Sequence, residues 1–369
     1  MKGIRLMAVA SVLVAWPTVA AAQGAPAAGA AGPDDSQSVR VGATMFYNYT
    51  YQTSPESTDA AGQTYSPSSF NVVRTYINVR GRLSHNVEFR ITPDIRPETG
   101  SGSSLKGSLS FRLKYGYAQF NLSEWTGAWT NTWVRGGIQQ TPFIDGQEGV
   151  YRYRFQGTVF AERDGGLSSS DAGVSLHTDL PKGYGDVHVG LYNGEGYGGF
   201  ETNGQKAFAV RATVRPMPEG TGLTRGLRLT AYLQRDQVVD GADRNRFIAS
   251  AWYEHALFNA GFDYLTRADQ AAPGAPTVDS GGYSLFVTPF FQEKGNGFEG
   301  LLRLDVFKPD KDLDARQRRA IVGVAYWFPH PGGSATAALL LDLEQVKYTN
   351  YADPRATDQR VFLHGLINF

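Results

Sequence analysis

The chain has 369 residues, with 35 lysines and arginines, 35 aspartates and glutamates, and no cysteine. The lack of cysteine excludes a disulfide framework, so stability must come from backbone pairing and burial. The balanced charge excludes the strongly basic surface typical of nucleic-acid-binding proteins, and we expect no nucleic-acid partner.

The first predicted element is an export signal. Lys2 and Arg5 precede an apolar run from Leu6 to about Val14, and small residues end the segment. This pattern is typical of a secretory signal peptide, and the run is too short to span a hydrocarbon core of about 30 Å. We expect a signal peptide over 1–22, a flexible tether over 23–37 and one folded unit over 38–369.

Alternating apolar and polar residues, the period of a β-strand, recur from residue 38 to the end of the chain. No later segment approaches 18 consecutive apolar residues, so the sequence offers no transmembrane helix. The sixteen predicted strands are 39–51, 69–82, 85–95, 106–121, 131–140, 170–179, 185–193, 206–216, 224–235, 245–256, 258–268, 281–291, 297–308, 316–329, 335–348 and 359–369.

The links between these strands alternate in length. Polar links of eight or more residues mostly follow the odd-numbered strands, whereas links such as Ser84–His85 and Glu293–Gly297 follow the even-numbered ones. Short turns at one end and longer loops at the other are typical of outer-membrane β-barrels with an even strand number. The sequence therefore predicts an all-β fold, a transmembrane antiparallel up-and-down barrel, with the tether on the periplasmic side. A soluble secreted β-sandwich remains an alternative.

A barrel of about sixteen strands is too wide for its own side chains to fill, so we expect a water-filled lumen. One face of each predicted strand carries most of the charge, and we place that face inside. The predicted pore-lining residues on the strands are Arg74, Arg80, Arg82, Arg90, Arg112, Lys114, Arg135, Arg211 and Arg215. Carboxylates on mostly later strands would form an opposing wall: Asp171, Asp179, Asp186, Asp305, Asp342 and Glu344. The excess of arginine favours anions.

The longest link, 141–169, follows the fifth strand, and we expect it to fold inward as a constriction loop. Its charged residues are Asp145, Glu148, Arg152, Arg154, Glu162, Arg163 and Asp164. Opposed charges across a constriction would screen solutes by charge. The alternative is that these charges form local salt bridges or a solvated lid.

Aromatic side chains mark the ends of the predicted strands, where they favour a membrane interface. Trp327 and Phe369 are the two that we assign to membrane anchoring and assembly. The last strand, which ends on Phe369, would pair with the first and close the barrel. Resemblance to outer-membrane proteins implies that a C-terminal aromatic strand is the signal read by the barrel assembly machinery.

The stretch VRGGIQQTPFIDGQ, followed by FAERDGG, resembles the phosphate-selective porin O and P family. The matching positions are Gly137, Gln140, Thr141, Pro142 and Phe143, and then Phe160, Glu162 and Arg163. The resemblance implies a sixteen-stranded channel, usually a homotrimer, in the outer membrane of a Gram-negative cell. Outer-membrane lipid and small anionic or neutral solutes would be its partners.

The sequence thus predicts a porin that gives passive diffusion of small hydrophilic solutes and ions, with a mild anion preference. A plugged substrate-specific transporter and a β-barrel enzyme remain alternatives. The six histidines are scattered and show neither a metal-ligand spacing nor a nearby nucleophile elbow. We therefore expect no enzyme activity, no metal and no cofactor.

Overall fold

The computed structural model describes residues 35–201, 203–220, 224–330 and 335–369. The predicted signal peptide, and the predicted tether up to residue 34, lie outside the described residues.

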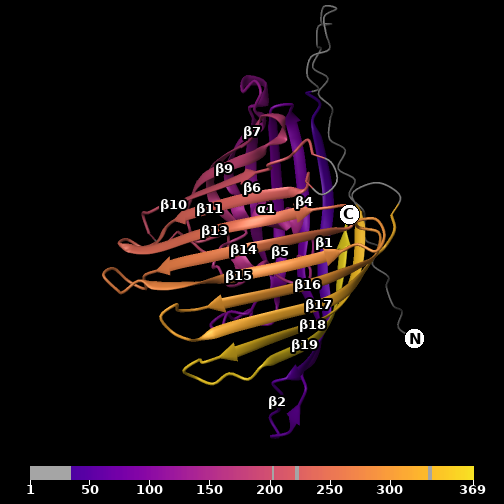
Figure 1. Ribbon diagram of the computed structural model, residues 1–369, viewed down its shortest axis with the longest axis vertical. Coiled ribbons are helices and arrows are strands. Elements are labelled where there is room, and N and C mark those ends of the chain that lie inside the picture. The colour runs from indigo at the N-terminus through magenta and orange to yellow at the C-terminus, as the bar shows by residue number, and fades with distance from the viewer. Residues whose placement is uncertain (1–34, 202, 221–223, 331–334) are drawn as a thin grey trace, which may run out of the picture. The chain divides into compact units, whose positions relative to one another are not determined.

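The described chain is built almost entirely of β-strands (Figure 1). The strands of the first half are β1 (Ser38–Ser54), β4 (Ser68–Ser84), β5 (Val87–Pro97), β6 (Leu109–Asn121), β7 (Thr130–Gln140), β8 (Ser170–Asp179), β9 (Gly185–Tyr192) and β10 (Ala207–Val214). The strands of the second half are β11 (Leu227–Arg235), β13 (Ala242–Glu254), β14 (Phe258–Asp269), β15 (Val278–Pro289), β16 (Gly297–Lys308), β17 (Arg316–Trp327), β18 (Thr336–Thr349) and β19 (Asp358–Asn368).

The remaining elements are short. They are the strands β2 (Ser57–Thr58), β3 (Thr64–Tyr65) and β12 (Gln237–Val239), the helices α1 (Pro142–Val150) and α2 (Phe160–Arg163), and the 3-10 turns η1 (Ser123–Trp125) and η2 (Pro181–Gly183). No helix among the described residues is long and apolar enough to cross a membrane.

The strands form one closed antiparallel barrel. The sheet contains 17 strands, of which β12 is a three-residue strand that pairs with β13 beyond β11, so sixteen full strands make the wall. Consecutive full strands pair with one another, and β1 pairs with both β4 and β19. The predicted fold class and strand count are confirmed. The longest connections, 55–67, 98–108, 141–169 and 193–206, share one end of the barrel, and the shortest, 85–86, 180–184 and 255–257, share the other. The predicted alternation in length is incomplete, because 215–226 at the second end is longer than 236–241 at the first.

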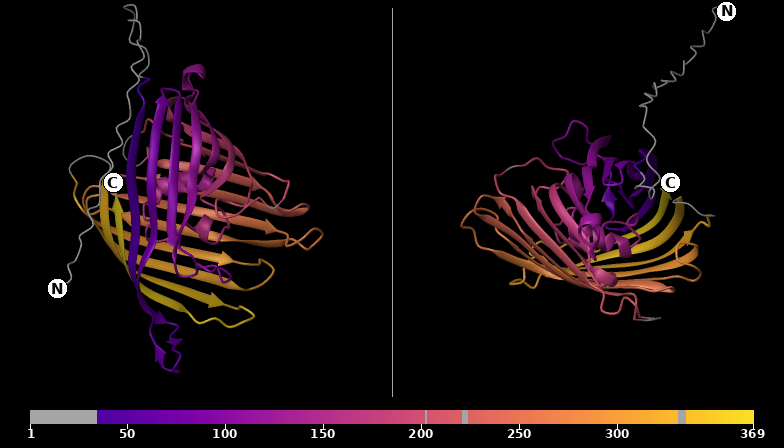
Figure 2. Two further views of the ribbon diagram at one scale, coloured as in Figure 1. Left: turned by 180° about the vertical axis from the view of Figure 1, so that it is seen from behind. Right: turned by 90° about the horizontal axis from the view of Figure 1, so that it is seen from above.

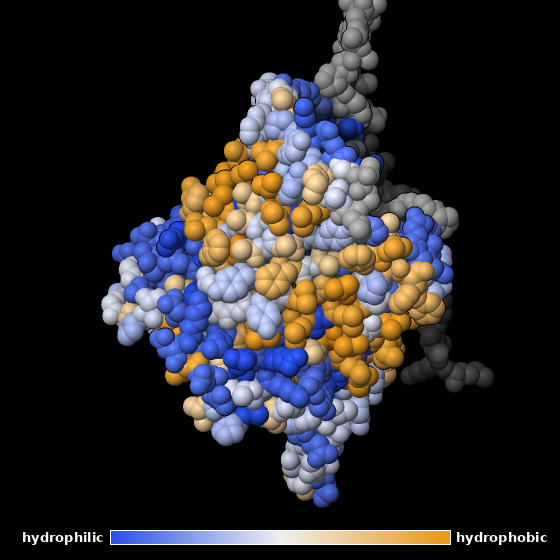
Figure 3. Space-filling model, in the orientation of Figure 1, coloured by the Kyte–Doolittle hydropathy of each residue, from blue (hydrophilic) through white to orange (hydrophobic). Residues whose placement is uncertain are grey.

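The outer face of the barrel is apolar over the middle of the strands. On β17 and β18, Val322, Val324 and Leu341 point outward and are exposed, whereas Ile321 and Leu340 point inward and are buried. Figure 3 shows hydrophobic side chains gathered over the middle of this face and hydrophilic ones toward the strand ends at its left and lower left. Such a surface suits hydrocarbon rather than water.

The inner face is less uniformly charged than the alternation predicted. Strands β13 to β18 turn large apolar residues inward, and these are fully or almost fully buried: Ile248, Trp252, Leu265, Phe286, Leu301, Ile321 and Leu340. They form one hydrophobic cluster with residues of the segment between β7 and β8. Figure 2 shows the helices of that segment enclosed by the strands. The prediction of a charged inner face is wrong for these strands because the segment between β7 and β8 packs against their inner surface.

Candidate functional site

The segment 141–169, which we call the inner loop, leaves and rejoins the wall at neighbouring positions. Gln140 at the end of β7 pairs with Ser170 at the start of β8. One residue further in, the Thr141 hydroxyl donates to the Ser168 carbonyl at 2.5 Å, and the Thr141 amide donates to the Ser169 carbonyl at 3.3 Å. Pro142 stands at the first turn of α1, where its missing N–H leaves no helical bond unmade.

Aromatic side chains attach the inner loop to the wall. The ring centroid of Phe143 lies 5.4 Å from that of Tyr232 and 5.6 Å from that of Trp252. Further along, Tyr151 packs edge-on against Phe286 at 5.0 Å. Each such pair adds about 0.5–1.5 kcal/mol beyond the burial of its area. One side of the inner loop is therefore a dry core shared with the wall.

Polar side chains of the wall bond the backbone carbonyls of the inner loop, which would otherwise be buried without a donor. In each bond a wall side chain donates to a carbonyl oxygen of the inner loop: Arg211 to that of Pro142 at 3.0 Å, Asn259 to that of Val150 at 3.0 Å, Arg303 to that of Thr158 at 3.0 Å, Arg267 to that of Asp164 at 2.8 Å and Arg246 to that of Gly165 at 2.8 Å. Arg211, expected to line an open pore, is instead buried and also bonds Asp186. Its role is to hold the start of the inner loop.

The predicted acidic wall is wrong for Asp305, Asp342 and Glu344, because these carboxylates are buried and paired. Asp179 and Asp186, of the same predicted set, are partly exposed beside His177. Asp305 bonds Arg303 at 2.7 Å, and Glu344 accepts from Arg319 at 2.5 Å. Asp342 lies 3.0 Å from His364. Asp171, on β8, accepts from the amides of Ala172 and Gly194.

Arg163 of the inner loop joins this buried network instead of facing a passage, whereas Arg152 pairs with a buried carboxylate and also lines a cavity with Glu148 and Arg154. Arg163 lies 3.6 Å from Glu344, and burial lowers the pKa of its guanidinium to about 10. Arg152 bonds Glu299, a residue that sequence reasoning did not single out, at 2.9 Å. These two arginines therefore fasten the inner loop to β16 and β18.

One group of basic side chains on β1 and β4 to β7 is left uncovered by the inner loop. Arg40, Arg80 and Arg90 are successive cross-strand partners on β1, β4 and β5, and so form one row across the wall. In the neighbouring row, Arg82 pairs with Glu88, and Gln119 pairs with Arg135. The predicted residues Arg80, Arg82, Arg90 and Arg135 are thus brought together.

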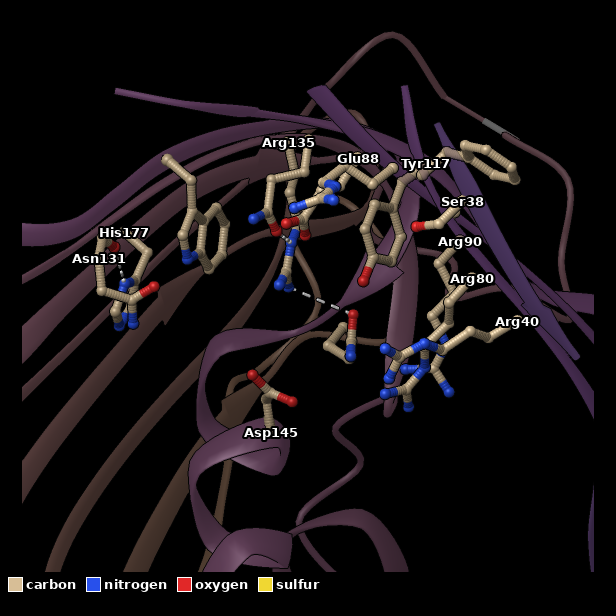
Figure 4. A pocket seen from close by; sticks show the side chains of 16 residues that line it. Ser38, Arg40, Arg80, Glu88, Arg90, Tyr117, Asn131, Arg135, Asp145 and His177 are labelled. Carbon is tan, nitrogen blue, oxygen red and sulfur yellow. Dashed lines mark hydrogen bonds between the residues drawn. The ribbon is translucent and has the colours of Figure 1, made fainter. Parts of the chain in front are cut away.

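These arginines surround a cavity of about 520 Å³. Figure 4 shows the guanidinium groups of Arg40, Arg80 and Arg90 close to one another, with Asp145 of α1 across the cavity from them. Its charged lining comprises five arginines and two carboxylates, apart from His177: Arg40, Arg80, Arg82, Arg90, Arg135, Glu88 and Asp145. The arrangement gives this side of the barrel a strongly positive field.

The predicted residues Arg74, Arg112 and Lys114 gather one step further along the same strands. Arg112 lies 3.4 Å from Asp94 and donates to the Tyr197 hydroxyl at 2.8 Å. Arg74 lies 3.8 Å from the same carboxylate, and Lys114 is buried beside Tyr76. Because Asp94 is fully buried beneath two arginines, this second cluster is partly neutralised.

Three charged side chains of the inner loop form one cluster. Arg154 lies 2.7 Å from Glu148 and 3.3 Å from Glu162. Burial alone would lower the pKa of Arg154, but the two carboxylates outweigh burial and raise that pKa above its usual value. The triad keeps one net negative charge. Of the inner-loop carboxylates, Asp145 is the one that lines the cavity of the arginine rows.

Trp327 is not a membrane anchor, which corrects the sequence interpretation. Its side chain points into the barrel, is 3% exposed, and donates to the Tyr153 hydroxyl at 3.3 Å. The alternation of β17 places Tyr326, its neighbour, on the outer face instead. Phe369 is 63% exposed and pairs through its backbone with Ala43.

Arg215 does not line the pore in the way expected. It follows the last residue of β10, in the connection 215–226, and its amide donates to the Tyr184 carbonyl at 2.7 Å. The side chain therefore belongs to the rim at the short-turn end rather than to the wall.

Sequence reasoning missed Arg40, Asp94 and Tyr197. Arg40 stands between Val39 and Val41, and this alternation indicates that Arg40 points into the barrel. Tyr197 lies in the connection 193–206, where nothing in the sequence predicts that it folds back onto β5 and β6. Among the described residues, no group of three histidine, aspartate or glutamate side chains is arranged to hold a metal ion.

No family model and no curated protein matches the sequence of the chain. Solved structures do match its fold. An anion-selective porin from Comamonas acidovorans is 14% identical, with a TM-score of 0.61 over 90% of this chain and 100% of that chain. The outer-membrane channel DcaP of Acinetobacter baumannii is 12% identical, with a TM-score of 0.58 over 90% and 97%. OmpF of Salmonella typhi is 10% identical, with a TM-score of 0.58 over 90% and 97%.

At these identities the similarity establishes the fold. The resemblance to the phosphate-selective porin O and P family stays a prediction. The expected location in the Gram-negative outer membrane agrees with this fold, which the chain shares with outer-membrane porins.

Proposed function

We propose that the protein is an outer-membrane porin through which small hydrophilic solutes and ions diffuse passively, with a mild preference for anions. The observation that carries this proposal is the division of the barrel interior. The inner loop covers the inner face of β13 to β18 with a shared apolar core, whereas β1 and β4 to β7 keep their arginines around a cavity. The inner loop is then the constriction, and the passage runs between it and the arginine rows.

The charge of that cavity supports the anion preference. Five arginines line it against Glu88 and Asp145. In a narrow passage with low-dielectric walls, an excess of fixed positive charge raises the local concentration of anions. The preference is mild because Asp145 opposes the arginine rows, and because the second basic cluster contains Asp94.

The wider proposal covers assembly and surroundings. The protein works without enzyme activity as a homotrimer in outer-membrane lipid, after removal of residues 1–22 and insertion by the barrel assembly machinery. A structurally similar protein, OmpT of Vibrio cholerae, has been solved in a trimer form. The apolar outer face of the barrel is compatible with both lipid and a second copy.

The test is single-channel recording of the purified protein in a planar bilayer under a KCl gradient. We expect conductance steps and a reversal potential of anion sign. The variant Arg40→Gln/Arg80→Gln/Arg90→Gln should shift that potential toward the cation sign. Lys106→Gln, in the exposed connection between β5 and β6, is the control and should not.

The outcomes separate the parts of the proposal. A cation-sign potential from the unaltered protein would refute the anion preference and leave the porin. Correctly folded protein that never conducts would refute the porin and favour a plugged transporter or an enzyme. Folding is checked independently by the shift in gel mobility that heating produces in intact barrels.

A further inference from the structure

The outer surface of the barrel carries a second basic cavity, of about 380 Å³, at the end where the long connections lie. Its lining residues are Tyr264, Gly281, Gly282, Tyr283, Val306, Lys308, Lys311 and Arg316. Tyr264 and Tyr283 are exposed on the outer face, so this cavity is separate from the lumen. Every charged residue that lines it is basic.

The strand register extends this basic surface beyond the cavity. Tyr264, Tyr283 and Val306 lie in one cross-strand row on the outer face. The same row continues through Arg318 on β17 to Lys347 on β18. Like charges directly opposite each other destabilise a sheet, and a bound anion would relieve the repulsion between Arg318 and Lys347.

The outward basic residues differ from the inward ones in their partners. Arg303 and Arg319, which point inward, each bond a carboxylate. Within the described parts of the chain, Lys308, Lys311, Arg316, Arg318 and Lys347 form no ion pair. The nearby acidic residues Asp279, Asp310, Asp312 and Asp314 belong to the adjoining strand end and loop, and none of them lines the cavity.

Position along the strands indicates what these cations face. On β16 the outward residues run Leu302, Leu304, Val306 and then Lys308, and on β18 they run Leu339, Leu341, Leu343, Gln345 and Lys347. The surface therefore changes from apolar to basic as the strand approaches the long connections. Tyr264 and Tyr283 mark that boundary, where aromatic rings favour a membrane interface.

We propose that this surface binds a phosphorylated lipid of the outer leaflet. The phosphate groups lie in the cavity against Lys308, Lys311 and Arg316, and near the Arg318–Lys347 pair. The acyl chains lie along the leucines and valines below. Gly281, the cross-strand partner of Lys308, adds no side chain to the cavity. Charge-assisted bonds from ammonium and guanidinium groups are the strongest that a phosphate accepts.

The test measures binding of bisphosphorylated lipid A to the full-length protein in detergent by native mass spectrometry. Each basic residue near an anionic headgroup strengthens binding about fivefold, so Arg318→Gln/Lys347→Gln should bind roughly 30-fold more weakly. The control Lys106→Gln/Lys182→Gln removes two exposed charges elsewhere and should bind as the unaltered protein does. Lipid A without phosphate should bind all three proteins equally.

Two results would overturn the assignment. One is equal affinity of the unaltered protein and Arg318→Gln/Lys347→Gln for bisphosphorylated lipid A, with both proteins shown to be folded by their heat-dependent gel mobility. The other is displacement of the lipid by inorganic phosphate at the lipid's own concentration, which would mean that the surface binds phosphate alone and not a lipid.

Discussion

At the scale of single residues, the row formed by Arg40, Arg80 and Arg90 is the arrangement that stability alone does not explain. Cross-strand partners of like charge cost roughly 0.2–1 kcal/mol each in a sheet. Arg80 has such a partner on both sides. Elsewhere inside the barrel, Arg303 and Arg319 are matched with carboxylates, so the unmatched row is best explained by its effect on solutes.

The substitution Arg80→Gln should therefore stabilise the barrel while weakening its anion preference. The expected gain is up to about 1–2 kcal/mol, because two like-charge contacts are relieved. Arg135→Gln is the comparison: Arg135 bonds Gln119 at 2.7 Å and lies 3.8 Å over the ring of Trp133, so its loss should destabilise. The midpoint of heat-induced gel-mobility change measures the first effect, and reversal potential the second. A lower midpoint for Arg80→Gln would contradict this account.

At the scale of elements, the strands were predictable and the coverage of their inner faces was not. Alternation over 297–308 predicts β16 with the same bounds that the structure shows. The alternation does not reveal that the inner loop covers Leu301 and Arg303. One signal was present within the loop: Tyr151, Tyr153 and Phe155 alternate with arginines, which indicates a segment with one apolar side. The charges of this segment alone predict arginines in an open pore, whereas the aromatic spacing indicates that the segment packs against the wall.

The contact between β16 and the inner loop has two parts, which substitution can separate. Arg303 neutralises buried Asp305, and it also donates to the carbonyl of Thr158. Arg303→Met should cost about 3–5 kcal/mol, because it leaves a buried carboxylate unpaired. The double variant Arg303→Met/Asp305→Leu removes that charge and should recover most of the stability.

Neither variant restores the bond to Thr158, so both should show a looser constriction, with larger and noisier single-channel conductance. Thermal midpoints and bilayer recordings on the two variants provide the check. Conductance equal to that of the unaltered protein in both would show that the inner loop does not constrict the passage.

At the scale of the whole barrel, closure depends on the last strand. The wall has no free edge because β19 pairs with β18 on one side and β1 on the other. The final bonds join the two ends of the described chain: Ala43 and Phe369 exchange backbone hydrogen bonds, both at 3.0 Å, and the Thr44 hydroxyl donates to Asn368 at 2.6 Å. An unclosed barrel would expose unpaired backbone groups to hydrocarbon, at several kcal/mol for each group.

The last three residues should therefore be needed for folding even in detergent, without any cellular factor. Deletion of residues 367–369 removes the backbone bonds of Phe369 and the β19 partners of Thr44 and Met45, and we expect loss of the heat-dependent gel-mobility shift. Phe369→Leu keeps the backbone pairing, so it should refold in detergent like the unaltered protein. If the ring is also the assembly signal, the same variant should accumulate poorly in the outer membrane of cells. Poor refolding of Phe369→Leu in detergent would contradict this division, because it would assign the ring itself to closure.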